Sequence, residues 1–338
     1  MLKKVNDFKV LLLIGLSIFY KLNCREIKQE TFMPLSVFSK ICAALQIKEP
    51  EIIDLEDSLF EKKEISVSIL RLDNIHPVIS GNKLFKLVYF LKDAIESDHK
   101  TVITFGGAYS NHLAATAFAC ESLQLKSVGI VRGERSKNLS HTLQFCLEHG
   151  MQIEFISRSD YKNVDAEFLK RIKKTFGEHI LIPEGGFSEK GKCGASLIKE
   201  YFLDKNFTHI VLPVGTATTM AGMVDANKTH SKIIGFGILK GMNDLQRRLQ
   251  FLKVNPTKDF VFINDYHFGG YAKKTSELIS FMNYFFDKHL IPLDFVYTGK
   301  MMFGIYDMAG KNFFERGSKI LCIHTGGLQG NKSLGETF

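Results

Sequence analysis

From residue 101 onward, short runs rich in β-branched and aliphatic residues alternate with longer stretches in which apolar residues recur at helical spacing. This alternation predicts an α/β fold with mainly parallel sheets. Several runs end in glycine where the next helix begins, and open α/β sheets bind ligands at the carboxyl ends of their strands. We therefore expect the functional site near these glycines. The predicted strands are TVITFGG (101–107), SVGIVRG (127–133), MQIEFISR (151–158), HILIPEGG (179–186), THIVLPVG (208–215), KIIGFGIL (232–239) and KILCIHTGG (319–327).

A helix is predicted upstream, in the segment HPVISGNKLFKLVYFL (76–91). Its apolar residues recur at i, i+3, i+4 and i+7, so one face is buried and Lys83 lies in the first turn, after the candidate caps Ser80 and Asn82. A cation at a helix start is mildly disfavoured by the helix dipole. From the residues alone, Lys83 is either a solvated lysine or a lysine placed there for a function.

The composition indicates a folded protein with a sizeable core, because 45% of the 338 residues are hydrophobic and 24% are charged. The net charge of +8 is spread along the chain, without the dense basic block of a nucleic-acid-binding surface. Nucleic acid is therefore not an expected partner. The six cysteines form no CxxC pair and have no neighbouring histidine at metal-ligand spacing. This pattern predicts no metal site and a reducing compartment, the cytoplasm.

The N-terminus contains an apolar run at residues 10–20, preceded by Lys3 and Lys4. This arrangement resembles a signal peptide or a short membrane anchor. The run is short for a bilayer span, however, and no small-x-small cleavage site follows it. We therefore expect residues 1–34 to be an N-terminal extension, with membrane association or export as the alternative.

The segment VLPVGTATTMAG (211–222) predicts an anion site, since a strand ends at a turn rich in glycine and threonine and a helix follows. The backbone N–H groups of residues 215–219, the hydroxyls of Thr216, Thr218 and Thr219, and the helix N-terminus can bind a phosphate without a cationic side chain. The turn matches neither a nucleotide P-loop nor GxGxxG. A phosphate monoester on a cofactor suits it best, and an ordinary turn is the alternative.

Polar side chains also gather where the next predicted helix begins, in TFGGAYSNHLAATAFA (104–119). Ser110, Asn111 and His112 lie together there, either as simple helix caps or as donors to a carboxylate and a phenolate oxygen. Two further segments place a tyrosine beside glycine, and each alone is a weak signal: Tyr271 in GGYAKK, and Tyr297, followed by Thr298, in DFVYTGKMMFG.

Taken together and in this order, these segments resemble the 1-aminocyclopropane-1-carboxylate (ACC) deaminase and D-cysteine desulfhydrase family. That family lies in the tryptophan-synthase-β-like, or fold type II, group of pyridoxal-phosphate (PLP) enzymes. The similarity extends from about residue 34 to the end of the chain, and the ordered set of motifs is far more specific than any single one. Its carriers are HPVISGNKLFKL, TFGGAYSNH, LPVGTATTMAG, GGYAK, VYTGKMMFG and HTGGLQG.

The resemblance implies a two-domain α/β enzyme that forms a homodimer. We expect a large PLP-binding domain made of residues 35–87 and 186–338, and a small α/β domain of residues 88–185 inserted between these two parts. Lys83 and the turn at 215–219 are far apart in the sequence and must meet at one cofactor. The site is therefore expected in the cleft between the domains.

The resemblance also implies which residues contact the cofactor. Lys83 is expected to hold PLP as a Schiff base, and a lysine on a rigid element can later move a proton at the substrate Cα. Ala217 stands where relatives often have glycine, which predicts a slightly altered phosphate turn. The expected cofactor contacts are Gly215, Thr216, Ala217, Thr218 and Thr219 at the phosphate, Asn111 at the ring hydroxyl, and Thr298 at the pyridine nitrogen.

On the substrate side, the resemblance implies that Tyr271 and Tyr297 line the site and that Ser110 assists at the carboxylate or in proton transfer. Thr298 stands where the deaminase pattern has a glutamate, whose charge would stabilise a protonated pyridine. Desulfhydrase-like members have threonine there. The expected function is therefore PLP-dependent β-elimination from a small D-amino acid, most specifically D-cysteine to pyruvate, sulfide and ammonia.

Three alternatives stay open on sequence grounds. The first is ACC deamination, because the loops that distinguish a cyclopropane from a thiol cannot be positioned from the sequence. The second is a non-catalytic homologue that binds PLP or an amino acid as a sensor, although all the polar site groups are retained. The third is a membrane-tethered interaction protein that uses the N-terminal segment.

Overall fold

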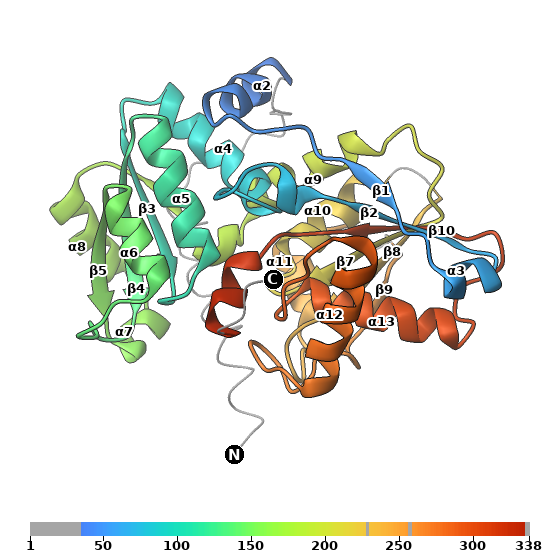
Figure 1. Ribbon diagram of the computed structural model, residues 1–338. Helices are drawn as coiled ribbons and strands as arrows, with labels where there is room; N and C mark the ends of the chain where they lie inside the picture. Colours follow the sequence, from blue (N-terminus) through green and yellow to red (C-terminus); the bar gives the residue numbers. More distant parts are fainter. Residues whose placement is uncertain (1–34, 228–229, 256–258, 335–338) are drawn as a thin grey trace.

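The computed structural model describes residues 35–227, 230–255 and 259–334, which form two β-sheets flanked by helices (Figure 1). The six-stranded sheet has the order β1-β2-β10-β7-β8-β9, and the four-stranded sheet has the order β5-β4-β3-β6. All paired strands are parallel except β1 and β2. The predicted α/β class with mainly parallel sheets is confirmed. The larger sheet consists of β1 (Ile52–Asp54), β2 (Ser66–Leu70), β7 (His209–Val214), β8 (Lys232–Gly237), β9 (Val261–Ile263) and β10 (Lys319–Ile323).

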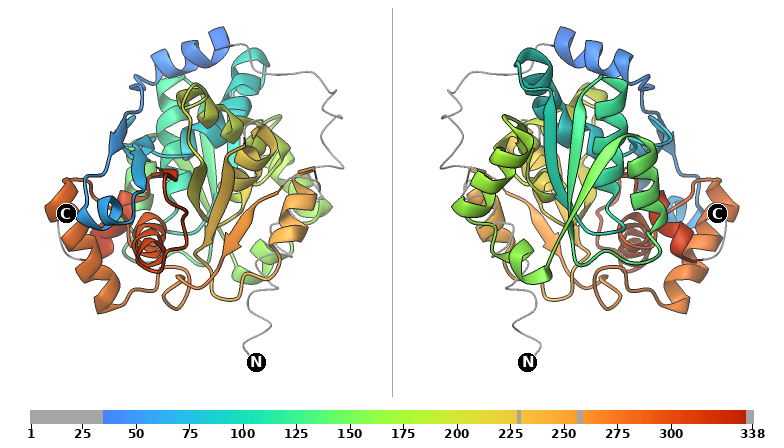
Figure 2. Two further views of the ribbon diagram at one scale, coloured as in Figure 1. Left: turned by 90° about the vertical axis from the view of Figure 1, so that its right-hand side faces the viewer. Right: turned by 90° about the vertical axis from the view of Figure 1, so that its left-hand side faces the viewer.

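The four-stranded sheet has a hydrophobic core on each face, because successive side chains of a strand point to opposite faces. Ile130 of β4 packs with Phe168 on one face, and the adjacent Val131 packs with Leu113 on the other. Helices α7 and α8 cover the first face, and α5 and α6 cover the second (Figure 2). The elements are β3 (Thr101–Gly106), β4 (Lys126–Arg132), β5 (Met151–Ile156), β6 (Ile180–Ile182), α5 (Asn111–Ser122), α6 (His141–Glu148), α7 (Arg158–Lys162) and α8 (Ala166–Phe176).

The six-stranded sheet is likewise covered on both faces. Ile320 of β10 packs in one core with residues of α3, α12 and α13, and the adjacent Leu321 packs in another with residues of α2, α4, α10 and α11. The helices are α2 (Leu35–Ala44), α3 (Ser58–Lys62), α4 (Lys83–Glu96), α9 (Glu189–Ser196), α10 (Thr218–Ala226), α11 (Leu245–Phe251), α12 (Ser276–His289) and α13 (Thr298–Gly310). Short 3₁₀ helices occupy Leu72–Asn74, Glu184–Gly186, Leu197–Tyr201 and Leu328–Leu334.

Helix α4 is the predicted helix that begins at Lys83, and it connects the two sheets. Its Leu87 lies in one continuous core with Val102 of the smaller sheet and Leu212 of the larger. Residue 88, where the small domain is predicted to begin, lies inside this helix. The proposed domain boundaries stay a prediction, although every strand of the smaller sheet falls within residues 88–185.

The seven predicted strands are all present, as β3 to β8 and β10. Strands β1, β2 and β9 were not predicted. β1 and β9 are only three residues long, and β2 lies before the regular alternation that begins at residue 101.

Across the described ranges, no helix is both long enough and apolar enough to cross a bilayer. The apolar run at residues 10–20 lies outside those ranges, so its role stays a prediction. The same ranges contain no group of three or more histidine, cysteine, aspartate or glutamate side chains arranged to hold a metal ion.

Candidate active site

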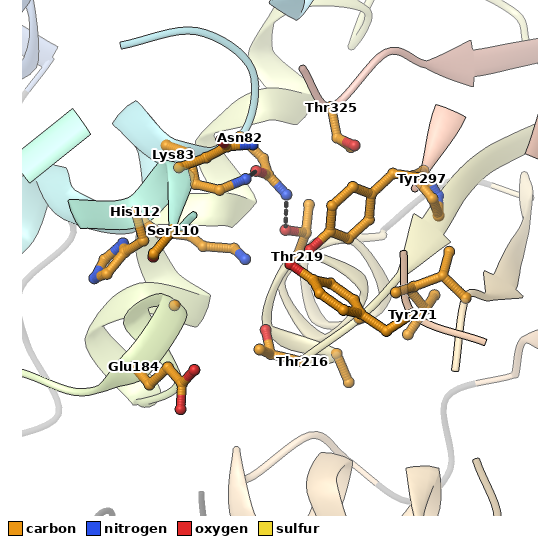
Figure 3. Close-up of a pocket in the computed structure, with 18 of the residues that line it drawn as sticks. Asn82, Lys83, Ser110, His112, Glu184, Thr216, Thr219, Tyr271, Tyr297 and Thr325 are labelled. Carbon is orange, nitrogen blue, oxygen red and sulfur yellow. Dashed lines mark hydrogen bonds between the residues drawn. The ribbon is translucent and has the colours of Figure 1, made fainter. Parts of the chain in front are cut away.

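The carboxyl ends of strands from both sheets surround a cavity of about 290 Å³. The turn after β3, the turn after β7 and the first turn of α4 line it, as Figure 3 shows for the labelled residues. These are the glycine-bearing strand ends where the sequence predicts the site. Of the predicted site residues, nine line the cavity: Lys83, Ser110, Asn111, Gly215, Thr216, Ala217, Thr219, Tyr271 and Tyr297. Thr218 and Thr298 are not among the lining residues.

Lys83 is the first residue of α4, and it lines the cavity. Its Nζ donates a hydrogen bond to Asn82 Oδ1 (2.6 Å), and Asn82 Nδ2 donates to Thr219 Oγ1 (2.8 Å; Figure 3). Asn82 therefore joins the lysine to the turn after β7, 137 residues further along the chain. Burial lowers the pKa of Lys83 to about 8, against the opposing effect of the Asp294 charge. A nucleophilic, uncharged amine is thus accessible near neutral pH.

The turn after β7 has the features of an anion cradle. Helix α10 begins at Thr218, so its first N–H groups have no partner within the helix. Thr216 and Thr218 form a hydroxyl–hydroxyl hydrogen bond of 3.0 Å, and Arg248 Nη1 donates to the carbonyl of Gly215 (2.9 Å). Ala217 adopts φ = 72°, a left-handed conformation that costs an alanine about 1–2 kcal/mol. This conformation explains why glycine suits the position.

A second lysine, Lys86, lines the cavity one helical turn after Lys83 and is 6% exposed. Burial, together with the nearby charge of Lys83, holds its pKa well below the usual value. Its side chain also packs against Gly186, where a Cβ atom would lie 3.0 Å from Lys86 Cβ. Lys86 was not predicted from the sequence, because a lysine between leucine and phenylalanine residues resembles a surface residue of an amphipathic helix.

The N-terminus of α5 presents polar groups to the cavity. Ser110 is the N-cap, and its Oγ accepts a hydrogen bond from Leu113 N (3.3 Å). Asn111 is the first residue of the helix and also lines the cavity. Since the first N–H groups of a helix attract anions, this end of α5 is suited to a carboxylate.

His112 follows in α5 and is held neutral. Thr104 Oγ1 donates to the carbonyl of Ile182 (3.0 Å), so its oxygen accepts from His112 Nε2 (3.0 Å). The proton is therefore on Nε2, and Nδ1 has no hydrogen-bond partner in the described structure. Burial, and then the charges of Lys86 and Lys83, lower the pKa of His112 to about 3. His112 is thus an acceptor and not an acid at neutral pH.

Tyr271 and Tyr297 form the opposite wall (Figure 3). Their ring centroids are 6.3 Å apart, with the ring planes at 78°. Lys83 Nζ lies 5.9 Å from the centroid of the Tyr297 ring. Burial raises the pKa of both tyrosines. Both hydroxyls therefore stay protonated, and they are hydrogen-bonded to each other.

The structure places Thr298 behind this wall. Its hydroxyl donates to Asp294 Oδ1 (2.7 Å) and accepts from Asp294 N (2.9 Å), and the side chain is fully buried. Thr325, which follows β10, lines the cavity instead, and its carbonyl accepts from Asn82 N (3.2 Å). Thr325 was not predicted as a site residue, although the motif HTGGLQG contains it. Its position after a strand and before two glycines was the available signal.

These residues fit the chemical groups of PLP. An amine of lowered pKa, a glycine- and threonine-rich turn at a helix N-terminus, a second buried lysine, and amide and hydroxyl donors line one cavity. The sequence matches the family of pyridoxal-phosphate dependent enzymes over residues 56–326. The chain belongs to this family. Its cofactor is therefore PLP, as the sequence predicts.

Two individual relatives and one solved structure are similar to this chain over most of its length. A Thermotoga maritima protein that carries ACC deaminase as a provisional name is 32% identical over 303 residues, which are 83% of this chain and 95% of that protein. An Arabidopsis thaliana protein named mitochondrial bifunctional D-cysteine desulfhydrase/ACC deaminase is 31% identical over 280 residues, or 75% of this chain and 70% of that protein. A crystal structure of an ACC deaminase homologue is 27% identical with a TM-score of 0.73, covering 88% of this chain and 97% of its own. The protein is thus a PLP-dependent enzyme with ACC deaminase and D-cysteine desulfhydrase relatives.

Proposed function

We propose that the enzyme catalyses β-elimination from a small D-amino acid, and that D-cysteine is its substrate. The observation that carries this proposal is that no carboxylate of the described residues lines the cavity beside Asn82 and Thr325. Among the lining residues, the one carboxylate is Glu184, and Figure 3 draws it at the end of the cavity opposite Thr325. A neutral hydroxyl suffices where a good β-leaving group departs. Ring opening of a cyclopropane has no such group and benefits from a carboxylate at the pyridine nitrogen.

The cofactor is assigned to the residues whose chemistry matches each of its groups. Lys83 would hold it through Nζ, and the turn 215–219 together with Lys86 would hold the phosphate. Asn111 is assigned to the ring hydroxyl. Thr325 takes the pyridine-nitrogen role first expected of Thr298, because the Thr298 hydroxyl is already bonded to Asp294. Bound PLP supplies the stabilisation of negative charge at the substrate Cα.

The substrate is assigned to the space between α5 and the tyrosines. Its carboxylate binds at the N-terminus of α5, where Ser110 adds a hydroxyl. Lys83 Nζ would accept the proton from the substrate Cα. Protonated Tyr271 and Tyr297 orient the leaving thiol and can donate a proton to it. Overall, D-cysteine and one water give pyruvate, hydrogen sulfide and ammonia.

A second candidate activity is deamination of ACC. The names of the Thermotoga maritima and Arabidopsis thaliana relatives favour it, and the latter name includes both activities. The two candidates share the cofactor, the lysine and the carboxylate site. They differ in the bond broken at Cβ, so product analysis separates them.

The test is a substrate panel offered to the purified holoenzyme: D-cysteine, L-cysteine, β-chloro-D-alanine, D-serine and ACC. We expect pyruvate from D-cysteine and β-chloro-D-alanine, equimolar sulfide from D-cysteine, and little 2-oxobutyrate from ACC. Preference for L-cysteine would overturn the assigned stereochemistry, and no turnover of any compound would favour the sensor alternative. Light scattering on the same sample tests the expected homodimer, and fractionation of cells tests the expected cytoplasmic location.

A further inference from the structure

Lys300 is a buried lysine that the proposed chemistry does not use. It lies in the first turn of α13, three residues after Tyr297, and is 1% exposed. Its Nζ donates to the carbonyls of His267 (2.9 Å) and Gly270 (2.7 Å). Lys300 does not line the cavity. Burying a charge is costly unless hydrogen bonds compensate it, and these two carbonyls are the acceptors of the Lys300 ammonium group.

The two carbonyls belong to the loop that carries Tyr271. Residues 264–275 contain neither helix nor strand. Gly269 and Gly270 have φ values of 88° and 113°, which a residue with a side chain rarely adopts. Gly269 N donates to His267 Nδ1 (3.0 Å), and Gly270 N donates to His267 O (2.9 Å), so the loop folds back on itself at the point that Lys300 contacts.

The other tyrosine is fixed from the same helix terminus. Asp294 Oδ2 accepts from the backbone N–H groups of Val296 (2.9 Å) and Tyr297 (2.8 Å), and Asp294 is fully buried. Burial lowers the pKa of Lys300 to about 8, and the charge of Asp294 acts against that decrease. One end of α13 thus holds the backbone on both sides of the tyrosine pair.

We propose that Lys300 is a positioning residue that sets Tyr271 against Tyr297 by holding the carbonyls of His267 and Gly270. The inference rests on the proposed role of the tyrosines on the substrate side. It assigns Lys300 no contact with substrate or cofactor. Misplacement of a positioned group by about 1 Å can cost on the order of hundredfold in rate. Loss of Lys300 should therefore act on turnover only through Tyr271.

The first test needs neither cofactor nor substrate. Lys300→Met keeps the length and apolar stem of the side chain but removes its donors. In the apoprotein, we expect hydrogen–deuterium exchange to become at least about tenfold faster in peptides covering 264–275 and to stay unchanged elsewhere. The matched control is Lys192→Met, because Lys192 is also buried (7% exposed) and donates to Asp225 (2.8 Å) and the Lys253 carbonyl (3.3 Å), away from the cavity. Equal exchange of the loop in both variants and wild type would overturn the proposal.

The second test is a double-mutant cycle of Lys300→Met with Tyr271→Phe. If Lys300 acts through Tyr271, the double variant should lose no more kcat/KM than the more impaired single variant. If the two single-variant losses in kcat/KM instead multiply in the double variant, Lys300 acts independently of Tyr271, and the proposal is overturned. Lys300→Gln, which retains one donor group, should recover part of the loss and replaces Lys300→Met if that variant does not fold. The cycle uses whichever panel compound the wild type consumes, so failure of the D-cysteine assignment does not affect it.

Discussion

The depressed pKa of Lys83 makes a quantitative prediction about how the apoprotein takes up its cofactor. The perturbation is pH. At about pH 7.5, an amine with a pKa of about 8 is roughly one quarter neutral, whereas an ordinary lysine with a pKa of 10.5 is about 0.1% neutral. The neutral fraction is thus about 200-fold larger for Lys83. The rate constant for covalent uptake of PLP should rise about tenfold per pH unit below pH 8 and level off above it.

The assay is stopped-flow absorbance after PLP is mixed with apoprotein, with α-acetyl-lysine as the reference amine. Dividing the two rate constants cancels the titration of PLP itself. The ratio should be flat below about pH 8 and fall about tenfold per unit above it, because only the reference amine continues to deprotonate up to about pH 10.5. A ratio that stays flat to pH 10 would refute the lowered pKa of Lys83.

Substitutions at four positions test the roles of individual residues in and behind the cavity wall. Lys83→Ala should give a colourless, inactive protein whose melting temperature is nearly unchanged. Borohydride reduction of the wild-type holoenzyme, followed by peptide mapping, should label Lys83 alone. Label on another lysine would contradict the assignment of Lys83. Thr298→Val should lower the free energy of unfolding by about 1–3 kcal/mol, because it removes both hydroxyl contacts with Asp294, and it should leave kcat per folded enzyme unchanged. Thr325→Val should lower kcat and leave the free energy of unfolding nearly unchanged. Denaturant titration measures the first quantity in both variants, and turnover measures the second. Ala217→Gly should change the free energy of unfolding by less than about 1 kcal/mol. Glycine removes the cost of the left-handed backbone conformation, but it also loses the buried methyl group and adds conformational entropy to the unfolded chain. Ala217→Val should be clearly destabilised in the same titration.

The fold could be predicted wherever the chain alternates regularly. Strands β3 to β8 and β10 each follow a stretch with helical periodicity, and the helix at Lys83 shows a full apolar face. Strands β1 and β9 have only three residues each, too few for any periodicity to emerge. Their place in the sheet is set by pairing with β2 and β8, which is a long-range contact.

The candidate site was predicted where a polar residue lies directly after a strand or at a helix start. Lys83, Asn111 and the turn at 215–219 satisfy that condition, and all of these except Thr218 line the cavity. Thr298 satisfies it too, but a hydrogen bond to Asp294, four residues before it, turns the hydroxyl away from the cavity. Local sequence does not specify which of two partners a hydroxyl selects. Lys86 was missed for a related reason, since its burial depends on the packing of α4 between both sheets.

We propose above that this PLP enzyme eliminates thiol from D-cysteine in preference to opening the ring of ACC. The most direct measurement is a competition, with both compounds at equal concentration in one vessel and the pyruvate and 2-oxobutyrate formed at early times compared. Their ratio gives the ratio of the two kcat/KM values without separate calibration of active enzyme. We expect pyruvate in excess of 2-oxobutyrate by at least about tenfold, the effect of about 1.4 kcal/mol. Equal amounts, or an excess of 2-oxobutyrate, would contradict it.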